Sequence, residues 1–215
     1  GGTSLVLDSS SFMSCSADTG GGVYWYASTS ESMLTVNSSS FTACEALADS
    51  GGAIYAEVSS TTDVSTIAVK SSSFTSCSAD NNGGGLFADS VSNVAVESSF
   101  FFSCTADSNG GGLFASGVTS MTVKSSSFDS CVAVSRQGGG LYVSGSEVSS
   151  TVVDSSSFAS CTSNTAGGGL CVTAVSSMAV VSSSFDSCVA SSTGGGIYAS
   201  SSTVTVDSSF FTGCS

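Results

Sequence analysis

A nine-residue phrase, V-x-S-S-S-F-x-x-C, recurs along the chain with small variations, and a short polar stretch and a run of glycines follow it. Its Phe and Cys occur eight times, at Phe12/Cys15, Phe41/Cys44, Phe74/Cys77, Phe101/Cys104, Phe128/Cys131, Phe158/Cys161, Phe185/Cys188 and Phe211/Cys214. Successive copies lie 26 residues (Phe185 to Phe211) to 33 residues (Phe41 to Phe74) apart. A repeat of this length predicts a solenoid, because one copy cannot bury its apolar face until the next copy stacks on it.

Apolar and polar residues alternate within each copy, which is the period of a β-strand. One strand follows each glycine run, and its apolar residues share a column: Val23, Ile54, Leu86, Leu113, Leu141, Leu170 and Ile197. A second strand carries pairs such as Leu5/Leu7 and Val94/Val96, and we expect a third short strand around each Phe-x-x-Cys. We therefore predict an all-β fold: one parallel β-helix over residues 1–215, with about eight coils of 26–33 residues and three strands per coil.

Charged residues give an independent sign of the register. At the position after the second strand's last inward residue, Lys70, Glu97, Lys124 and Asp154 alternate in sign. In a parallel, in-register stack these side chains lie one strand spacing apart, where opposite charges attract and like charges repel. An exposed pair contributes only about 0.2–1 kcal/mol. The alternation is therefore expected to fix register more than to stabilise the fold.

Composition excludes several classes of function. The net charge is −13, and Lys70, Lys124 and Arg136 are the only basic residues, so no basic patch can neutralise the phosphates of a nucleic acid. Anionic membrane surfaces are disfavoured for the same reason, and no apolar run approaches the roughly 20 residues of a membrane span. Polarity comes instead from 57 Ser and 20 Thr, while 40% of the residues are hydrophobic. That share is enough to build a core.

The glycine run carries a resemblance to a known repeat. Gly51-Gly52-Ala53-Ile54 matches the G-G-A-[ILV] motif of the polymorphic outer-membrane protein repeat, whose second motif is F-x-x-N. Cys replaces that Asn in all eight copies, which is more similar to surface or fibre proteins of microbial eukaryotes. The resemblance implies a right-handed β-helix with an adhesive or structural role. We expect an extracellular or cell-surface segment of a longer repetitive protein or fibre, associating end to end or with other chains of the fibre.

The cysteines leave three alternatives open. The eight cysteines of the repeat form one column, the cysteine ladder, and Cys171 stands alone in another. Free buried thiols acting as small hydrophobes are favoured. Disulfides between neighbouring coils are the second alternative, because a Cα separation of about 4.8 Å is within the permitted range, although in-register side chains point the same way. A metal site is least favoured, since no C-x-x-C spacing occurs.

Aromatic residues follow the inward aliphatic column and should therefore face outward. This aromatic column consists of Tyr24, Tyr55, Phe87, Phe114, Tyr142 and Tyr198, and Cys171 interrupts it. An exposed stripe of this kind predicts ladder stacking, a lateral contact with another chain, or stacking on sugar rings. Asn37-Ser38-Ser39 is an N-glycosylation sequon, and the serine triplets predict a surface array that can carry O-linked sugars.

Catalytic constellations are scarce. Asp80 and Asp107 would stack on adjacent coils, with Asp18 at the same position of the first coil, which is a spacing that a glycosidase pair or a calcium site could use. The chain contains no His to activate a serine, and Arg136 stands alone in a turn. We therefore expect solvated turn acids, no cofactor and no enzyme. The favoured function is an extracellular structural module; an adhesin-type binding module is the alternative, and a polysaccharide-active enzyme ranks third.

Overall fold

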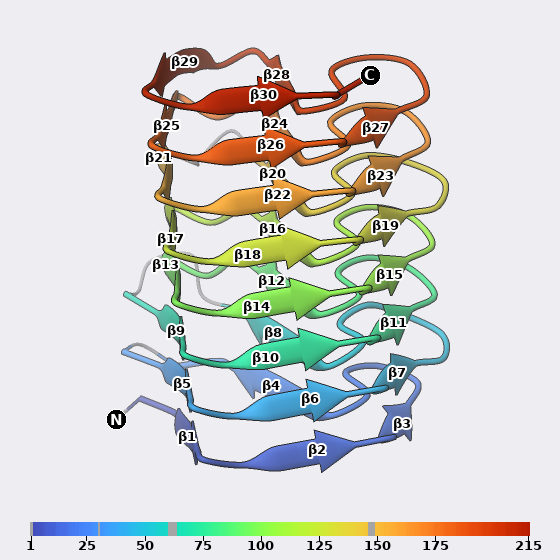
Figure 1. Cartoon of the computed structure of the whole chain (residues 1–215). Coiled ribbons are helices and arrows are strands. Elements are labelled where there is room, and N and C mark those ends of the chain that lie inside the picture. The colour runs from blue at the N-terminus through green and yellow to red at the C-terminus, as the bar shows by residue number, and fades with distance from the viewer. Residues whose placement is uncertain (1, 30, 60–63, 146–148) are drawn as a thin grey trace.

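The computed structural model describes residues 2–29, 31–59, 64–145 and 149–215. In these residues the chain winds around a single axis, and each coil lies on the coil before it (Figure 1). All strand pairs are parallel, and they join strands of successive coils into four sheets, here called A, B, C and D. Sheets A and B have eight strands and sheets C and D have seven, so seven complete coils are followed by the first half of another.

Sheets A and B hold the segments on either side of each serine triplet. Sheet A consists of β1 (Ser4–Asp8), β5 (Met33–Asn37), β9 (Thr66–Lys70), β13 (Asn93–Glu97), β17 (Ser120–Lys124), β21 (Ser150–Asp154), β25 (Ser177–Val181) and β29 (Thr203–Asp207). Sheet B consists of β2 (Ser11–Met13), β6 (Ser40–Thr42), β10 (Ser73–Thr75), β14 (Phe100–Phe102), β18 (Ser127–Asp129), β22 (Ser157–Ala159), β26 (Ser184–Asp186) and β30 (Phe210–Thr212).

Sheets C and D lie before and after the glycine run. Sheet C consists of β3 (Ser16–Ala17), β7 (Glu45–Ala46), β11 (Ser78–Ala79), β15 (Thr105–Ala106), β19 (Val132–Ala133), β23 (Thr162–Ser163) and β27 (Val189–Ala190). Sheet D consists of β4 (Val23–Ala27), β8 (Ile54–Val58), β12 (Leu86–Asp89), β16 (Leu113–Ser116), β20 (Leu141–Ser144), β24 (Leu170–Thr173) and β28 (Ile197–Ser200). No helix in the described part of the chain could cross a membrane.

The all-β parallel solenoid is confirmed, but a complete coil has four strands where we expected three. The segment around each Phe-x-x-Cys is two short strands, such as β14 and β15, rather than one. Between these two, Ser103 adopts a φ of 51°, in the left-handed region, and this breaks the extended conformation. The residue before the Cys has a positive φ in every other copy too: Ser14, Ala43, Ser76, Ser130, Ser160, Ser187 and Gly213.

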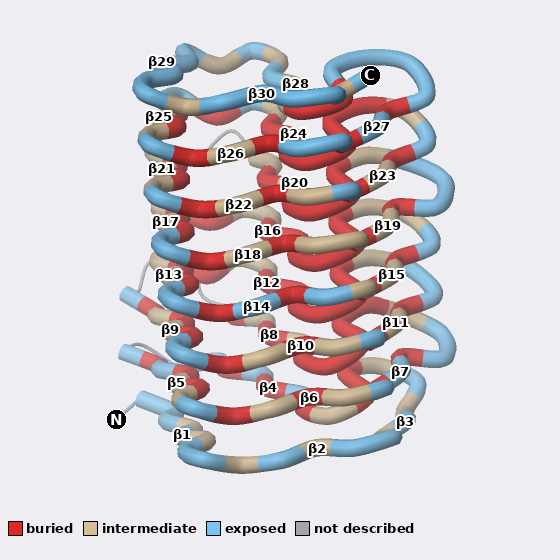
Figure 2. Tube along the Cα trace, viewed as in Figure 1, coloured by how far each residue is buried: buried red, intermediate tan, exposed pale blue. Residues whose placement is uncertain are grey.

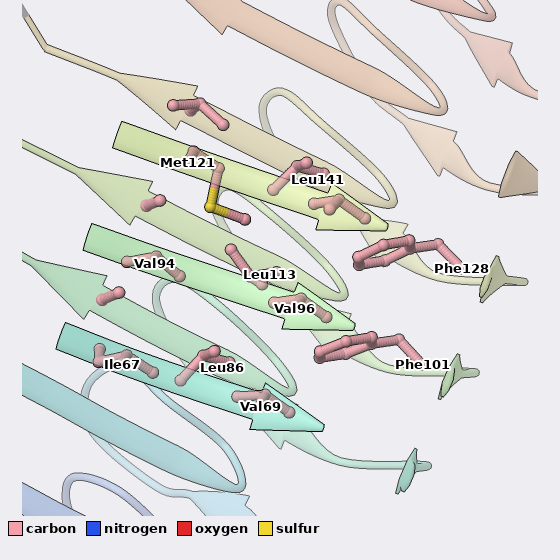
Figure 3. Close-up of a cluster of buried hydrophobic side chains, with 14 of the residues drawn as sticks. Ile67, Val69, Leu86, Val94, Val96, Phe101, Leu113, Met121, Phe128 and Leu141 are labelled. Carbon is pink, nitrogen blue, oxygen red and sulfur yellow. The ribbon is translucent and has the colours of Figure 1, made fainter. Parts of the chain in front are cut away.

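The core is a set of columns that run along the axis. The eight Phe rings of the repeat stack face to face, with centroids 4.5–5.0 Å apart and planes within 5° of parallel. Sheet D contributes Leu86, Leu113 and Leu141, which project toward the apolar side chains of sheet A (Figure 3). The inner wall is buried along the stack, while the first and last coils are more exposed because each has only one neighbour (Figure 2).

The glycine run allows the turn between sheets C and D to approach the neighbouring coil closely. A Cβ added to Gly84 would lie against the backbone oxygens of Thr105 and Gly111, nearer than van der Waals contact permits. Gly110 has a φ of +64°, and a Cβ there would come within 2.8 Å of the Cβ of Phe114. The glycines are therefore required by backbone contacts between coils and by contacts with sheet D.

Candidate functional site

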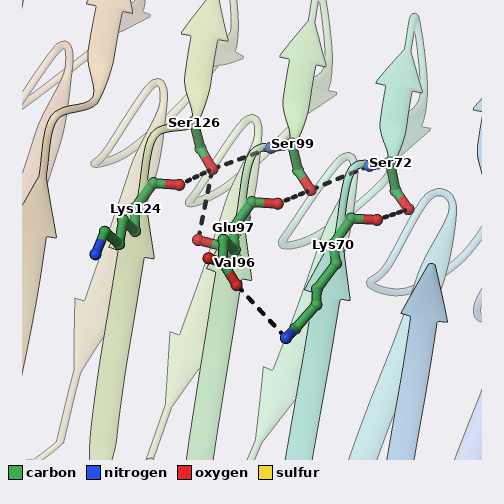
Figure 4. Close-up of polar contacts among 7 residues, drawn as sticks. All are labelled: Lys70, Ser72, Val96, Glu97, Ser99, Lys124 and Ser126. Carbon is green, nitrogen blue, oxygen red and sulfur yellow. Dashed lines mark hydrogen bonds and ion pairs between the residues drawn. The ribbon is translucent and has the colours of Figure 1, made fainter. Parts of the chain in front are cut away.

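Each serine triplet forms the corner between sheets A and B. In Ser125-Ser126-Ser127, Ser125 adopts a left-handed φ of 48° and Ser126 is only 3% exposed. The Oγ of Ser126 accepts a hydrogen bond from the Ser99 amide (3.1 Å) and donates one to the Lys124 carbonyl (2.8 Å), as Figure 4 shows. The same two bonds are made by Ser39, Ser72, Ser99, Ser156, Ser183 and Ser209. We call these middle serines the serine ladder.

The serine ladder corrects the expectation that the triplets form a surface array of hydroxyls. The middle serines of five triplets, those of Ser39, Ser72, Ser126, Ser156 and Ser183, are 1–3% exposed, and so is Ser99 in Ser98-Ser99-Phe100. In these triplets only the first and third serines remain available. In the sequon, Asn37 Nδ2 donates to Asp8 Oδ1 at 2.7 Å and the Ser39 hydroxyl donates to the Asn37 carbonyl at 2.8 Å. Glycosylation at Asn37 stays a prediction.

The expected charge ladder has the predicted register. Lys70 lies opposite Glu97, Glu97 opposite Lys124, and Lys124 opposite Asp154. The Lys70 Nζ lies 3.5 Å from the Glu97 Oε2, and this is the one ion pair found in the described part of the chain (Figure 4). About half of each side chain is exposed, so the pair is well screened by solvent. The alternating charges thus lie in register on the outer face of sheet A, and their role in fixing that register stays a prediction.

The cysteine ladder lies inside the coils, and all nine cysteines are free thiols, the first of the three alternatives. From the second coil onward, each Sγ is oriented by the coil before it: Cys131 donates to the Phe101 carbonyl at 3.5 Å, and Cys161 donates to the Phe128 carbonyl at 3.4 Å. Burial, together with hydrogen bonds to the adjacent thiols, raises the pKa of Cys131 well above its usual range. Burial alone raises the pKa of Cys171 to about 12. The thiols of Cys131 and Cys171 are therefore protonated, poorly nucleophilic packing groups.

The two ends of the cysteine ladder differ in burial from its middle. The six inner thiols, from Cys44 to Cys188, have no exposed surface, whereas Cys15 and Cys214 are only partly buried. Cys15 lies in the first described coil, and its Sγ donates to the Met13 carbonyl of its own coil at 3.7 Å. Cys214 still donates to the Phe185 carbonyl at 3.4 Å, but no described coil covers its other side. Full burial of a thiol therefore requires a coil on both sides.

The aromatic column stacks as predicted, but the expectation that all of it is exposed is wrong. Tyr24 is 55% exposed, whereas Phe87 and Phe114 are 9% and 8% exposed. Their rings stack with parallel planes and centroids 5.4 Å apart, and the turn residues Gly83 and Gly110 lie close to the Phe87 Cα and the Phe114 Cβ. The alternation of side chains along the strand correctly predicts that these rings lie on the outer face of sheet D. Side-chain parity, however, does not reveal that the turn between sheets C and D folds back over this face.

The tyrosines of the aromatic column have specific partners. The Tyr55 hydroxyl donates to Glu57 Oε2 at 2.8 Å; burial and this hydrogen bond raise the pKa of Tyr55 above its usual range. The Tyr142 hydroxyl lies 3.0 Å from Thr173 Oγ1. Tyr142 meets the ring of Phe114 at a tilt of 38°, and on its other side the column continues with Cys171. These contacts fix Tyr142 at the end of the continuous aromatic stack.

Sequence reasoning missed a ladder of polar side chains in the turns before the glycine runs. Asn109 Nδ2 donates to Asn82 Oδ1 at 3.0 Å, and the backbone N–H of Gln137 donates to Asn109 Oδ1 at 3.2 Å. The backbone N–H of Asn82 continues the ladder by donating to Ser50 Oγ at 3.2 Å. The signal in the sequence was the residue directly before each glycine run, which is polar in all these coils. We call these four residues the amide ladder.

A second group that sequence reasoning missed lies on the outer face of sheet B. Phe100 and Phe102 flank the buried Phe101 and are 39% and 37% exposed. Their rings are nearly parallel, with centroids 5.8 Å apart. In β10 and β18, the neighbours at these positions are Ser73, Thr75, Ser127 and Asp129. The pair is an aromatic island on an otherwise hydroxyl-rich face, and the run Phe100-Phe101-Phe102 was its signal in the sequence.

The candidate catalytic carboxylates are exposed turn residues. Asp80 and Asp107 follow Ala79 and Ala106, which are in register, so they do lie on adjacent coils; Leu47 separates Asp18 from them along the column. All three are exposed, and the described residues contain no group of His, Cys, Asp or Glu that could hold a metal ion. The arrangement therefore offers three solvated acids, two of which lie on adjacent coils.

Comparison with known proteins agrees with this architecture. A family model described as a right-handed β-helix region matches residues 1–211, which is nearly the whole chain. No curated protein and no solved structure gives a significant match. The family match covers the serine and phenylalanine columns and seven of the eight cysteines of the cysteine ladder, so the handedness expected from the resemblance is confirmed along with the fold.

Proposed function

Since the chain belongs to the right-handed β-helix family, we propose that it is a rigid structural module of an extracellular surface, built into a filament or fibre. One observation carries the proposal. The stack of eight Phe rings runs unbroken from Phe12 to Phe211, with every ring 4.5–5.0 Å from the next. A column that repeats in every coil resists bending and local opening along its whole length, which is the property that a structural rod requires.

The outer faces support packing against other chains. Only 9% of the residues are charged, and outward positions of sheet B are mostly Ser, Thr, Ala and Asp. Short side chains leave a flat surface, and a flat surface of low charge can lie against a similar one without burying many ions. Sugars attached at Asn37 or at the outer serines would decorate this surface. The extracellular location follows from the resemblance of the repeat and is part of the proposal.

Electron microscopy of the native material under non-reducing conditions tests the structural role. We expect filaments or bundled rods whose axial spacing is the coil-to-coil distance of about 4.8 Å. Mass spectrometry of the same material would reveal glycans at Asn37 and the outer serines. Isolated particles no longer than this one solenoid, with no lateral or axial contacts, would contradict the fibre role.

The aromatic island favours a second function, that of an adhesin-type binding module. Phe100 and Phe102 are exposed, adjacent and surrounded by hydroxyls, which suits a contact with a partner surface. Replacing both by Ser should abolish adhesion to the partner surface and leave any filament unchanged in the microscope. Equal adhesion by the double variant and the native chain would remove this second function.

A further inference from the structure

A hollow of about 480 Å³ is lined by residues of the turns that follow β19 and β23. These turns lie on the right side of Figure 1. Its volume falls within the range of about 300–1,000 Å³ typical of small-molecule sites. Asn109, Ser135, Arg136, Gln137, Tyr142 and Thr165 line it. The hollow therefore brings together an aromatic ring, a guanidinium, two amides and two hydroxyls from three successive coils.

The hollow lies where both the amide ladder and the aromatic column are interrupted. The amide ladder ends at Gln137, because the next coil has Ala166 at the following position. The aromatic column is interrupted in that same coil, where Cys171 lies opposite Tyr142. The Cys171 thiol donates to Gln137 Oε1 at 3.5 Å. The Gln137 Nε2, on the same side-chain amide, makes no hydrogen bond to the described residues. Two departures from the repeat thus coincide beside one set of polar groups.

Several polar groups at the hollow lack partners among the residues that the structure describes. The Thr165 Oγ1 is buried and has no hydrogen-bond partner within the described part of the chain. Arg136 is exposed, and its guanidinium makes neither an ion pair nor a hydrogen bond with the described residues. A buried hydroxyl without a partner costs free energy that a bound ligand can restore. An unpaired guanidinium on a chain with a net charge of −13 is a local site for an anion.

We propose that this hollow binds one residue of an anionic sugar. The Arg136 guanidinium pairs with its carboxylate or phosphate, and the ring of Tyr142 packs against the apolar face of the sugar. Gln137 Nε2, Thr165 Oγ1 and the Ser135 hydroxyl bond to the sugar hydroxyls. Asn109 forms the floor, because its side-chain amide is already bonded to Asn82, Ser108 and the Gln137 backbone. This binding role is separate from the proposed structural role and does not depend on fibre formation.

Titration of the chain of residues 1–215, followed by ligand-observed nuclear magnetic resonance, tests the site with three probes: glucuronate, glucose 6-phosphate and glucose. We expect at least one of the two anionic sugars to bind with a dissociation constant of about 1 mM, which is ordinary for a ligand of this size. Glucose should bind at least tenfold more weakly. Which anion binds more tightly distinguishes a sugar acid from a sugar phosphate.

Arg136→Gln should weaken binding of the preferred anion at least tenfold, and Arg136→Lys should weaken it less. Lys124→Gln is the matched control, because it removes the same charge from sheet A, away from the hollow, and should leave binding unchanged. Both arginine variants should retain the native circular dichroism spectrum, since the Arg136 side chain is exposed and unpaired among the described residues. The proposal is overturned if neither anion saturates the protein by about 20 mM, a ceiling some twentyfold above the expected constant. Equal binding of glucose, or no effect of Arg136→Gln, would also overturn it.

Discussion

The serine ladder makes a sharp prediction about what stabilises the corners between sheets A and B. Replacing Ser126 by Ala removes one hydroxyl from a site that is 3% exposed. The Ser99 amide then loses its acceptor, and the Lys124 carbonyl loses one of its two donors, because it still accepts from the Ser98 amide at 2.9 Å. The substitution therefore leaves one buried N–H without a partner and weakens one carbonyl.

The expected magnitude follows from these two losses. A buried donor without a partner costs about 1–3 kcal/mol, and the lost bond to a carbonyl that keeps another partner costs about 1 kcal/mol. Removing a hydroxyl oxygen opens almost no cavity, so packing adds little. We therefore expect Ser126→Ala to lower the free energy of unfolding by about 2–4 kcal/mol. This is a large share of the 5–15 kcal/mol that usually separates folded and unfolded chains.

Equilibrium unfolding in urea, followed by far-ultraviolet circular dichroism, measures this change. The matched control is Ser127→Ala, in the third residue of the same triplet, whose side chain makes no hydrogen bond in the described part of the chain. It should change the free energy by no more than about 0.5 kcal/mol. The m-value should stay constant in both variants, because the surface exposed on unfolding is the same. Equal midpoints for the two variants would refute the claim that the ladder stabilises the corner.

Three further predictions concern the core. Phe101→Ala should cost about 3–5 kcal/mol in urea unfolding, because its ring is fully buried between two others, whereas Phe102→Ala, which removes an exposed ring, should cost less than about 1 kcal/mol; equal costs would contradict the stack. Gly84→Ala should abolish the native circular dichroism spectrum, since its Cβ would meet two backbone oxygens of the next coil, whereas Gly85→Ala should fold with a lower midpoint, as Ala already stands at this column in the second coil. Burial raises the pKa of Cys131 above its unfolded value of about 8.5, so the melting temperature should fall as pH rises above that value, and Cys131→Ala should make this decline less steep between pH 8 and 10.

The sequence alone was sufficient for the register. Because a slip of one residue would turn every side chain to the other face, eight copies of the same phrase admit only one alignment that keeps Phe on Phe. That alignment places Lys70 opposite Glu97 and Lys124 opposite Asp154, and the same residues are paired in the structure. The parallel solenoid and the inward columns follow from the same argument, without any knowledge of the turns.

The backbone conformation of the corners was less accessible. A Ser before the Cys gives no local sign that Ser103 takes a left-handed φ, since Asn and Gly are the usual residues there. The strand around Phe-x-x-Cys therefore looked continuous, and three strands were expected instead of four. The burial of Ser126 was missed for a related reason. A serine triplet is typical of a polar surface, and the sequence does not show that its first residue adopts a left-handed φ. That conformation directs the second serine inward.

Parity also has a limit that explains the error at Phe87 and Phe114. Alternation along a strand tells which face of a sheet a side chain occupies, but not what lies beyond that face. Here the turn between sheets C and D returns over sheet D, and Gly110 can lie against Phe114 because it has no side chain. The outward rings become a second, smaller core between sheet and turn.

Inward positions and turn positions of this fold differ in how freely they can vary, and this difference explains where a binding site can arise. Inward positions are constrained, because each is packed between the corresponding residues of the coils above and below. The turn that covers sheet D has looser requirements, so residues there can change one coil at a time. When Ala166 and Cys171 replace an amide and an aromatic ring in one coil, the neighbouring coil keeps Gln137 and Tyr142, which lose the partners that the repeat would supply. A repetitive rod can thus acquire a local site by omitting side chains from one coil.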